Sequence, residues 1–334
     1  MKRAQNGLFI TPIVWGVWNS FYALRMAWKY GSALHAHESS RRRIKKSLRW
    51  ALLAAFKPRF SVEWFNWVRK PELQPFLEVN AYLALRPLHA YLSTRWNCRG
   101  RFKVIRDTYD LVLNHGGAVR QALLNPEGIV LARLEMPRLG LIEFGMCSDY
   151  GFRREGEFAL AMRTQGPPDY LMALAFGMER TGNDQWTCYI GAIQGRGGLE
   201  IMRETTKAMH GMRPRCLMVF LVQEVARALG AESVLGASNA IHVSRKKHLV
   251  HLPFRHAIPF DYDAFWTEYG AVHDSQGWFH LPTLLTRRSC CAIKPNKRSM
   301  YTNRYRMLDE LAEQIRRSMG AGSVIDCMSW NAAS

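Results

Sequence analysis

Two histidines stand where they could move protons near neutral pH. His210 follows a predicted helix at 200–209, and His242 follows a predicted strand at 233–237, so each lies beside the end of a core element. Histidine titrates close to neutrality, which suits it to general acid or base work. Asn239 comes three residues before His242 and could orient its ring. The alternative for both histidines is a hydrogen-bonded structural role, and the sequence alone does not separate the two.

Two glycine-containing loops are typical of anion-binding turns. The first covers 194–199 between a predicted strand and a predicted helix, and the second covers 210–215 directly before an apolar helix that begins at Pro214. Free N–H groups at a helix start and arginine side chains both bind anions. The alternative is that both loops are ordinary turns. The candidate cofactor-binding residues are Gln194, Gly195, Gly197, Gly198, Gly211, Arg213 and Arg215.

The cysteines and histidines predict neither a disulfide framework nor a metal centre. There are seven cysteines, an odd number, with no CxxC pair among them. The nearest metal-like run, His35-Ala36-His37, has one carboxylate beside it, Glu38, which is too few ligands for a zinc site. Reduced thiols of this kind are typical of a cytosolic protein.

Five short β-rich segments separated by tight turns occupy the middle of the chain. Sequential strands joined by tight turns predict an antiparallel meander. Helices are expected at 200–209 and from Pro214 to Gly230, a further buried strand at 233–237, and an amphipathic helix between Tyr301 and Met319. Asp261 and Asp263 flank Tyr262 before Phe265-Trp266, where they could orient a base or cap a helix, and capping is favoured. The predicted strands are 128–136, 139–147, 157–163, 170–178 and 186–194.

Positive charge is concentrated in the first third of the chain. Of a net charge of +19, residues 1–106 hold 20 Lys and Arg against four acids, whereas residues 107–334 hold 26 against 23. A predicted helix after Ser39 or Ser40 carries an apolar face from Ile44 to Phe56 and ends before Pro58. Basic side chains at a helix N-terminus oppose its dipole, so local stability does not explain them. The candidate membrane-binding residues are Arg41, Arg42, Arg43, Lys45, Lys46 and Arg49.

These cations fit anionic lipid, including lipid A phosphates, while a solvated helix face is the plain alternative. The uncharged run from Leu8 to Leu24 is about the minimum length for a bilayer span and is interrupted by Pro12 and Gly16, so a half-buried or interfacial helix is favoured. Nucleic acid is a third partner class, because Arg95-Trp96 could stack on bases, but no known nucleic-acid-binding motif accompanies it.

Four ordered motifs resemble those of the VirK/YbjX family of Gram-negative bacteria. They are 189–195, 206–214, 238–243 and 261–266, and Lys297-Arg298 with 305–311 fits the family as well. The resemblance covers most of the chain, from about His35 to about Ile315. It implies a role in virulence or in envelope and antimicrobial-peptide stress, and it implies no settled reaction.

The first loop is also similar to the pyrophosphate loop of the GNAT acyltransferases, a Q/R-x-x-G-x-G/A pattern between a strand and a helix. Leu199 departs from it, since a small residue is wanted there for backbone N–H groups to approach phosphates. This resemblance implies an acyl-CoA or acyl-carrier protein donor. His210 or His242 would take a proton from the acceptor, and Asn239 could polarise the acyl carbonyl.

The sequence therefore predicts an α/β (α+β) protein with a central, mostly antiparallel sheet, GNAT-like, preceded by a basic helical region. The expected divisions are a basic, mainly helical region at 1–125, an α/β body at 126–320 and a loose tail at 321–334. We expect a cytoplasmic protein, peripheral on the inner membrane, that is either an acyltransferase or a non-catalytic binding or regulatory factor.

Overall fold

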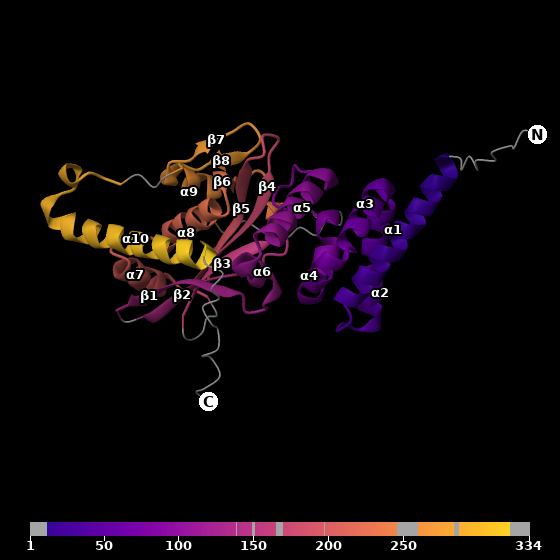
Figure 1. Ribbon diagram of the computed structural model, residues 1–334, viewed down its shortest axis with the longest axis horizontal. Helices are drawn as coiled ribbons and strands as arrows, with labels where there is room; N and C mark the ends of the chain where they lie inside the picture. The colour runs from indigo at the N-terminus through magenta and orange to yellow at the C-terminus, as the bar shows by residue number, and fades with distance from the viewer. Residues whose placement is uncertain are drawn as a thin grey trace, which may run out of the picture. The chain divides into compact units, whose positions relative to one another are not determined.

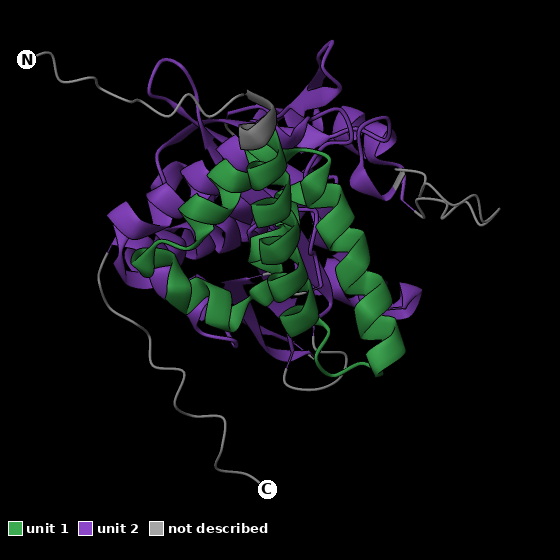
Figure 2. Cartoon of the chain, turned by 90° about the vertical axis from the view of Figure 1, so that its right-hand side faces the viewer, with its two compact units in different colours: residues 1–89 green, residues 90–334 purple. Residues whose placement is uncertain are grey.

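The computed structural model describes residues 12–137, 139–148, 151–164, 170–196, 198–245, 260–283 and 287–320. Two compact units divide between His89 and Ala90, whereas the change in sequence pattern lies near residue 125. The helices between these two points therefore belong to the second unit, coloured purple in Figure 2. The predicted tail at 321–334 and Gly197 lie outside the described residues.

The first unit is helical. Its longest elements are α1 (Pro12–Leu34), α2 (Ser40–Ala55) and α3 (Pro58–Val68), followed by the shorter η1 (Pro71–Leu73), α4 (Gln74–Val79) and η2 (Ala81–Leu88). Pro58 takes the first position of α3, where a missing N–H costs nothing, so the proline both separates two helices and starts one. Among the described residues, no helix is both long enough and apolar enough to cross a membrane.

The helical unit is held together by aromatic side chains. Trp64 is fully buried and donates from Nε1 to the carbonyl of Ala84 at 2.7 Å, which joins α3 to η2. Tyr30 of α1 stacks on Phe65 of α3 with ring centroids 5.9 Å apart. Burial of large rings with their polar atoms satisfied stabilises such a small helical layer.

The second unit is built on one eight-stranded sheet in the order β1-β2-β3-β4-β5-β6-β8-β7 (Figure 1). The first five strands form an antiparallel meander, as predicted, and each lies within two residues of its predicted bounds. The strands are β1 (Ile129–Met136), β2 (Gly140–Ser148), β3 (Phe158–Arg163), β4 (Met172–Arg180), β5 (Trp186–Gly195), β6 (Ala231–Ala237), β7 (Val272–His273) and β8 (Trp278–His280).

The two faces of the central strands carry side chains of different size. One face presents small residues, Ala159, Ala161, Ala173 and Ala175, and its buried cluster is completed by larger side chains such as Phe152. The other face presents large ones, with Phe158 and Phe176 stacked at 5.2 Å. Both sets are buried, which explains why the strands show only partial alternation in the sequence.

Helices accompany this sheet. The helices α5 (Cys98–His115) and α6 (Gly117–Leu124) precede it, α7 (Leu199–Ala208) and α8 (Pro214–Ala228) connect β5 to β6, and α9 (Tyr262–Tyr269) and α10 (Arg298–Gly320) follow. α8 packs on β3, β4 and β6, while α5 packs on β4. The expected mixed fold with a mostly antiparallel sheet is confirmed.

Candidate functional site

The site lies where two parallel strands separate. β5 and β6 are parallel, and their pairing ends at Ile190 and Gly236. β5 continues to Gly195, so its last residues have no β6 partner in the register. The carboxyl ends of parallel strands meet at one edge of a sheet, and ligands bind preferentially there. The loops after β5 and β6 are therefore neighbours in the fold.

A tyrosine from α9 occupies the point of separation. The backbone N–H of Ile193 donates to the Tyr262 hydroxyl at 3.1 Å, and that hydroxyl lies 3.3 Å from the Ile193 carbonyl, to which it can donate. The side chain thus satisfies backbone groups of β5 beyond the end of its ladder with β6. Burial raises the pKa of Tyr262 to about 12, so the hydroxyl keeps its proton at neutral pH.

His242 stacks on the same tyrosine. The two rings lie 4.7 Å apart at 26°, and His242 is buried. The Ser244 N–H donates to His242 Nδ1 at 3.3 Å. Because Nδ1 accepts this hydrogen bond, a neutral ring carries its proton on Nε2. This arrangement suits His242 to donate a hydrogen bond more than to accept a proton.

Asn239 is tied into the start of α9. Its Nδ2 donates to Asp261 Oδ1 at 2.7 Å, and its Oδ1 accepts from the Tyr262 N–H at 3.1 Å. Its own N–H donates to Asp263 Oδ1 at 2.7 Å. Asp261 also accepts from the Ala264 N–H at 3.2 Å. This bond confirms Asp261 as the predicted helix cap, whereas Asp263 accepts from Asn239. Because it accepts from the Tyr262 N–H, Asn239 positions Tyr262.

His210 is held by the C-terminal helix. Both Nε and Nη2 of Arg304 donate to the His210 carbonyl, at 3.1 and 2.7 Å. The residue has φ of 52°, in the left-handed region. Burial, together with Arg304 and Arg306, lowers the pKa of His210 and so favours the neutral ring. No described contact joins His210 to His242.

The first glycine loop follows β5 into α7. Gln194 and Gly195 are exposed at the end of the strand, and Gly198 is the N-cap residue of α7, without a side-chain cap. Arg196 lies over the Tyr170 ring, 4.5 Å from its centroid. Because Gln194 follows Ile193 directly, this loop starts beside the Tyr262 contact.

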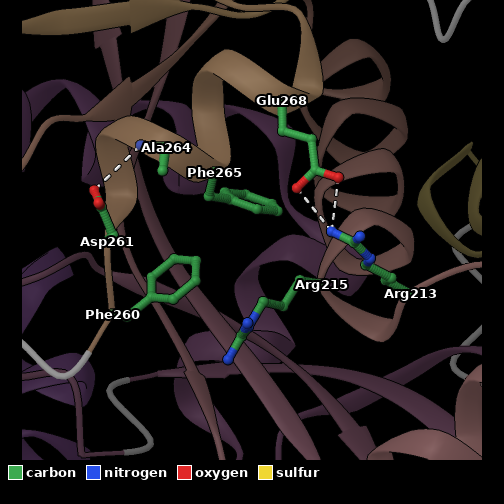
Figure 3. A pocket seen from close by; sticks show the side chains of 7 residues that line it. All are labelled: Arg213, Arg215, Phe260, Asp261, Ala264, Phe265 and Glu268. Carbon is green, nitrogen blue, oxygen red and sulfur yellow. Dashed lines mark hydrogen bonds and ion pairs between the residues drawn. The ribbon is translucent and has the colours of Figure 1, made fainter.

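The second loop opens on a pocket of about 240 Å³ between the start of α8 and α9 (Figure 3). Arg213 Nη1 donates to both carboxylate oxygens of Glu268 at 2.7 Å. Arg215 extends across the pocket so that its guanidinium lies 4.4 Å from the Phe260 ring centroid. The lining residues are Arg213, Arg215, Phe260, Asp261, Ala264, Phe265 and Glu268.

Aromatic contacts join this pocket to the separated strands. Phe260 lies 4.8 Å from Tyr262, centroid to centroid, and Tyr262 contacts both His242 and Ile193. Two predicted residues, Arg213 and Arg215, line the pocket, and two others, Asn239 and His242, contact Tyr262 beside it. Gln194 and His210 do not line the pocket. Gly211 has φ of 75° and makes the turn before α8.

Sequence reasoning missed Tyr262, Phe260 and Glu268 as functional candidates. Tyr262 lies between Asp261 and Asp263 in the sequence, and its contact with Ile193 spans 69 residues of chain. The only available indication was the aromatic run after Asp261. Within the described residues, no group of His, Cys, Asp and Glu could hold a metal ion.

The six candidate membrane-binding residues all belong to α2. Five of them are exposed, and Arg43 is half-buried. Lys46 pairs with Glu38, while the other five make no ion pair within the described part of the chain. Ser39 takes the N-cap position without a side-chain hydrogen bond.

Most of the apolar face predicted for α2 is exposed, as Ile44, Leu48, Leu52 and Phe56 show. Ala51 of that face is buried, together with Ser47, Trp50 and Ala54.

Comparison with known proteins identifies the family. A model described as "Protein of unknown function (DUF535)" matches residues 39–317, most of the chain. The chain belongs to this family. The protein YbjX of Escherichia coli K12 is 29% identical over 275 residues, which cover 80% of this chain and 81% of YbjX.

More distant relatives of this DUF535 protein are also similar. An uncharacterised protein of Haemophilus influenzae is 28% identical over 240 residues, 69% of this chain and 75% of the relative. The membrane protein LapB of Mannheimia haemolytica is 26% identical over 174 residues, 50% of this chain and 71% of LapB. No solved structure matches the chain.

Proposed function

We propose that the second unit binds an acyl thioester, either acyl-CoA or the acyl arm of an acyl-carrier protein, and transfers its acyl group. The observation that carries this proposal is the separation of β5 from β6 at Ile190 and Gly236. A phosphopantetheine arm carries amide groups, which can pair with the free edge of an extended strand as an added strand would. β5 extends beyond Ile190 along this edge, where the Tyr262 hydroxyl already contacts both backbone groups of Ile193, so the arm would pair beside that contact.

The pocket offers contacts for the anionic end of the donor. Arg215 is exposed and lies against Phe260, so a phosphate could bind its guanidinium while an apolar or aromatic group covers the ring. The first-turn N–H groups of α8 add a favourable dipole for an anion. Arg213 is already engaged with Glu268, so Arg215 is the stronger candidate.

Transfer requires an amine or hydroxyl acceptor to attack the thioester carbonyl. The new bond to carbon forms as the carbon–sulfur bond breaks, one proton leaves the acceptor, and one proton is gained by the thiolate. Tyr262 is protonated at neutral pH and could supply the second proton. His242 could donate from Nε2 to the developing oxyanion, the role predicted for Asn239, whose amide is occupied by Asp261. His210, the predicted base, does not line the pocket, so the acceptor would have to reach beyond the lining residues to use it.

Calorimetric titration tests the proposal. Palmitoyl-CoA, acetyl-CoA, free CoA and acylated carrier protein would each be titrated into the wild type, Arg215→Ala and Arg120→Ala. Arg120 is also an exposed helical arginine, on α6, and serves as the matched control. We expect binding of at least one acyl donor and about a tenfold weaker affinity for Arg215→Ala alone, as for the loss of one charge-assisted contact.

Absence of binding to every donor would remove the acyl-transfer proposal. The family membership would then favour the second function expected for this chain, a non-catalytic binding or regulatory factor in virulence or envelope stress. Donor binding without turnover, in the presence of amine and lipid acceptors, would favour the same alternative.

A further inference from the structure

The first unit exposes an apolar surface that its fold leaves uncovered. On α1, Val17, Phe21, Leu24 and Trp28 are exposed, and they recur every three to four residues along one side of the helix. On α2, Ile44, Leu48 and Leu52 are exposed at intervals of four. Phe21 is 61% exposed and Leu48 47%. These fractions are far above what core positions in a packed helical layer show.

The two stripes lie on the same side of the helix pair. α1 turns Tyr22 and Tyr30 toward α3, where they contact Asn66 and Phe65, and its exposed stripe is on the opposite side. On α2, the Trp50 ring points toward η2 and contacts Tyr82 in η2 and His89 directly after it. At about 100° per residue, Leu48 and Leu52 fall opposite Trp50.

Since α3 and η2 are joined by the Trp64 hydrogen bond to Ala84, they form a common layer behind the two helices. Both apolar stripes therefore face away from this layer. Gly31 lets the helices approach closely, because a Cβ there would lie 3.1 Å from the Trp50 side chain. Two adjacent helices with stripes on one side give a broad surface, which we call the apolar face: Val17, Phe21, Leu24, Trp28, Ile44, Leu48 and Leu52.

Cations accompany the apolar face, and acids are absent from the two helices that form it. Neither 12–34 nor 40–55 contains Asp or Glu. Arg41 and Lys45 are exposed beside the α2 stripe, and Arg25 beside the α1 stripe. An apolar centre with basic residues at its border is complementary to a lipid surface that presents phosphates around acyl chains. Trp28 also suits the headgroup boundary, because tryptophan is enriched at membrane interfaces.

We propose that the apolar face docks on an anionic lipid bilayer with α1 and α2 lying in the plane of the headgroups. Phe21, Leu24, Leu48 and their neighbours enter the acyl-chain boundary, and Arg41, Lys45 and Arg25 bind lipid phosphates. The proposal does not depend on acyl transfer, because it concerns the other unit. It differs from attraction by the six α2 cations alone, since it requires apolar insertion.

Flotation with vesicles tests the docking. Full-length protein would be mixed with vesicles of phosphatidylethanolamine and phosphatidylglycerol, or of phosphatidylcholine alone. We expect flotation with the first. The double variant Phe21→Ser with Leu48→Ser should partition at least about tenfold less, because two apolar side chains no longer enter the membrane. Val272→Ser removes an exposed apolar residue of the second unit, at 71% exposure, and should float like the wild type.

A second arm separates insertion from charge attraction. Arg41→Glu with Lys45→Glu is compared with Arg120→Glu and Lys297→Glu, which change the net charge equally on exposed residues of the second unit. The first pair should lose binding more than the second. Phosphatidylglycerol brominated on its acyl chain should quench tryptophan fluorescence of the wild type, and Trp28→Phe should reduce the quenching.

Three results would overturn the proposal. The first is unchanged flotation of the Phe21→Ser, Leu48→Ser variant. The second is an equal loss of vesicle binding in the two charge-reversed double variants, and the third is no binding of the wild type to either vesicle. If sedimentation instead shows a dimer that the same apolar variant dissociates, the apolar face binds a second copy of the chain, which is also a different conclusion. Circular dichroism melting of each variant checks that the first unit remains folded.

Discussion

Gln314 of α10 hydrogen-bonds both backbone groups of Arg133 on β1. The Arg133 N–H donates to Gln314 Oε1 at 2.8 Å, and Gln314 Nε2 donates to the Arg133 carbonyl at 3.0 Å. Farther along, Ser318 Oγ donates to the Leu131 carbonyl at 2.8 Å. β1 is an edge strand, and edge strands with free backbone groups promote association. α10 therefore covers this edge by imitating a neighbouring strand.

Gln314→Ala should destabilise the second unit by about 1–3 kcal/mol, because it leaves two partly buried backbone groups without their partner. Urea denaturation followed by circular dichroism measures the free energy of unfolding. Gln121→Ala, on the exposed side of α6, is the control. This surface change should alter the free energy of unfolding by no more than about 0.5 kcal/mol. Equal stability of the two variants would show that α10 does not complete the sheet through Gln314.

Tyr262→Phe should alter the dependence of stability on alkaline pH. The folded pKa, about 12, lies above the ordinary value of 10.0. The stabilisation from the protonated hydroxyl is therefore fully present below the ordinary pKa and is lost as pH rises through the folded pKa. We expect the wild type to lose about 2–3 kcal/mol more than Tyr262→Phe across this interval, since one pKa unit corresponds to about 1.4 kcal/mol. Parallel stability curves for the two proteins would contradict this placement of Tyr262.

Gly191→Ala should destabilise the protein through a direct collision. A Cβ at Gly191 would lie 1.9 Å from the Glu155 carbonyl oxygen, a backbone atom that cannot move without shifting its loop. We expect a loss of at least about 2 kcal/mol, the range found for overpacked cores. At Gly182 a Cβ would meet nothing within 4 Å, so Gly182→Ala is the matched control. Thermal denaturation of both variants makes the comparison.

Most elements of the second unit could be predicted because they have a strong local pattern, whereas β7 and β8, of two and three residues, are too short to show one. Pro214 begins α8 and Gly230 with φ of 82° follows its end, both visible in the sequence. The buried face of α2 could not be predicted. The sequence shows an apolar stripe on this helix but does not indicate which side of it packs against α1. Close approach at Gly31 buries Ser47 and Trp50 instead.

The site was predicted only in part, for a related reason. Arg213 and Arg215 lie near a helix start, which is a local signal. The contact between Tyr262 and Ile193 depends on how β5, β6 and α9 are placed, and no periodicity encodes that. The resemblance of the first loop to a GNAT loop rests on residue spacing, whereas phosphate binding by its glycines would depend on how closely the backbone approaches the ligand.

A substitution at Glu268 tests the acyl-donor site, because it is expected to increase affinity for the donor. Its carboxylate accepts two hydrogen bonds from Arg213 at the pocket. Both side chains are largely exposed, at 62% for Arg213 and 61% for Glu268. An exposed pair of this kind contributes little to stability, about 0–1 kcal/mol. Glu268→Gln removes a negative charge from the pocket and releases Arg213, so affinity for an acyl-CoA should rise severalfold in calorimetric titration.

The direction of that change separates the two roles of Glu268. If Glu268 only competes with the phosphates of the donor for Arg213, then Glu268→Gln binds more tightly, and adding Arg213→Ala to it cancels the gain. If Glu268 instead holds Arg213 in the geometry that binds phosphate, both single variants weaken binding. Glu310→Gln on α10, also an exposed acid but outside the pocket, controls for the change in net charge and should leave the affinity unchanged. An equal rise for Glu310→Gln would mean that long-range charge, rather than Arg213, governs the binding.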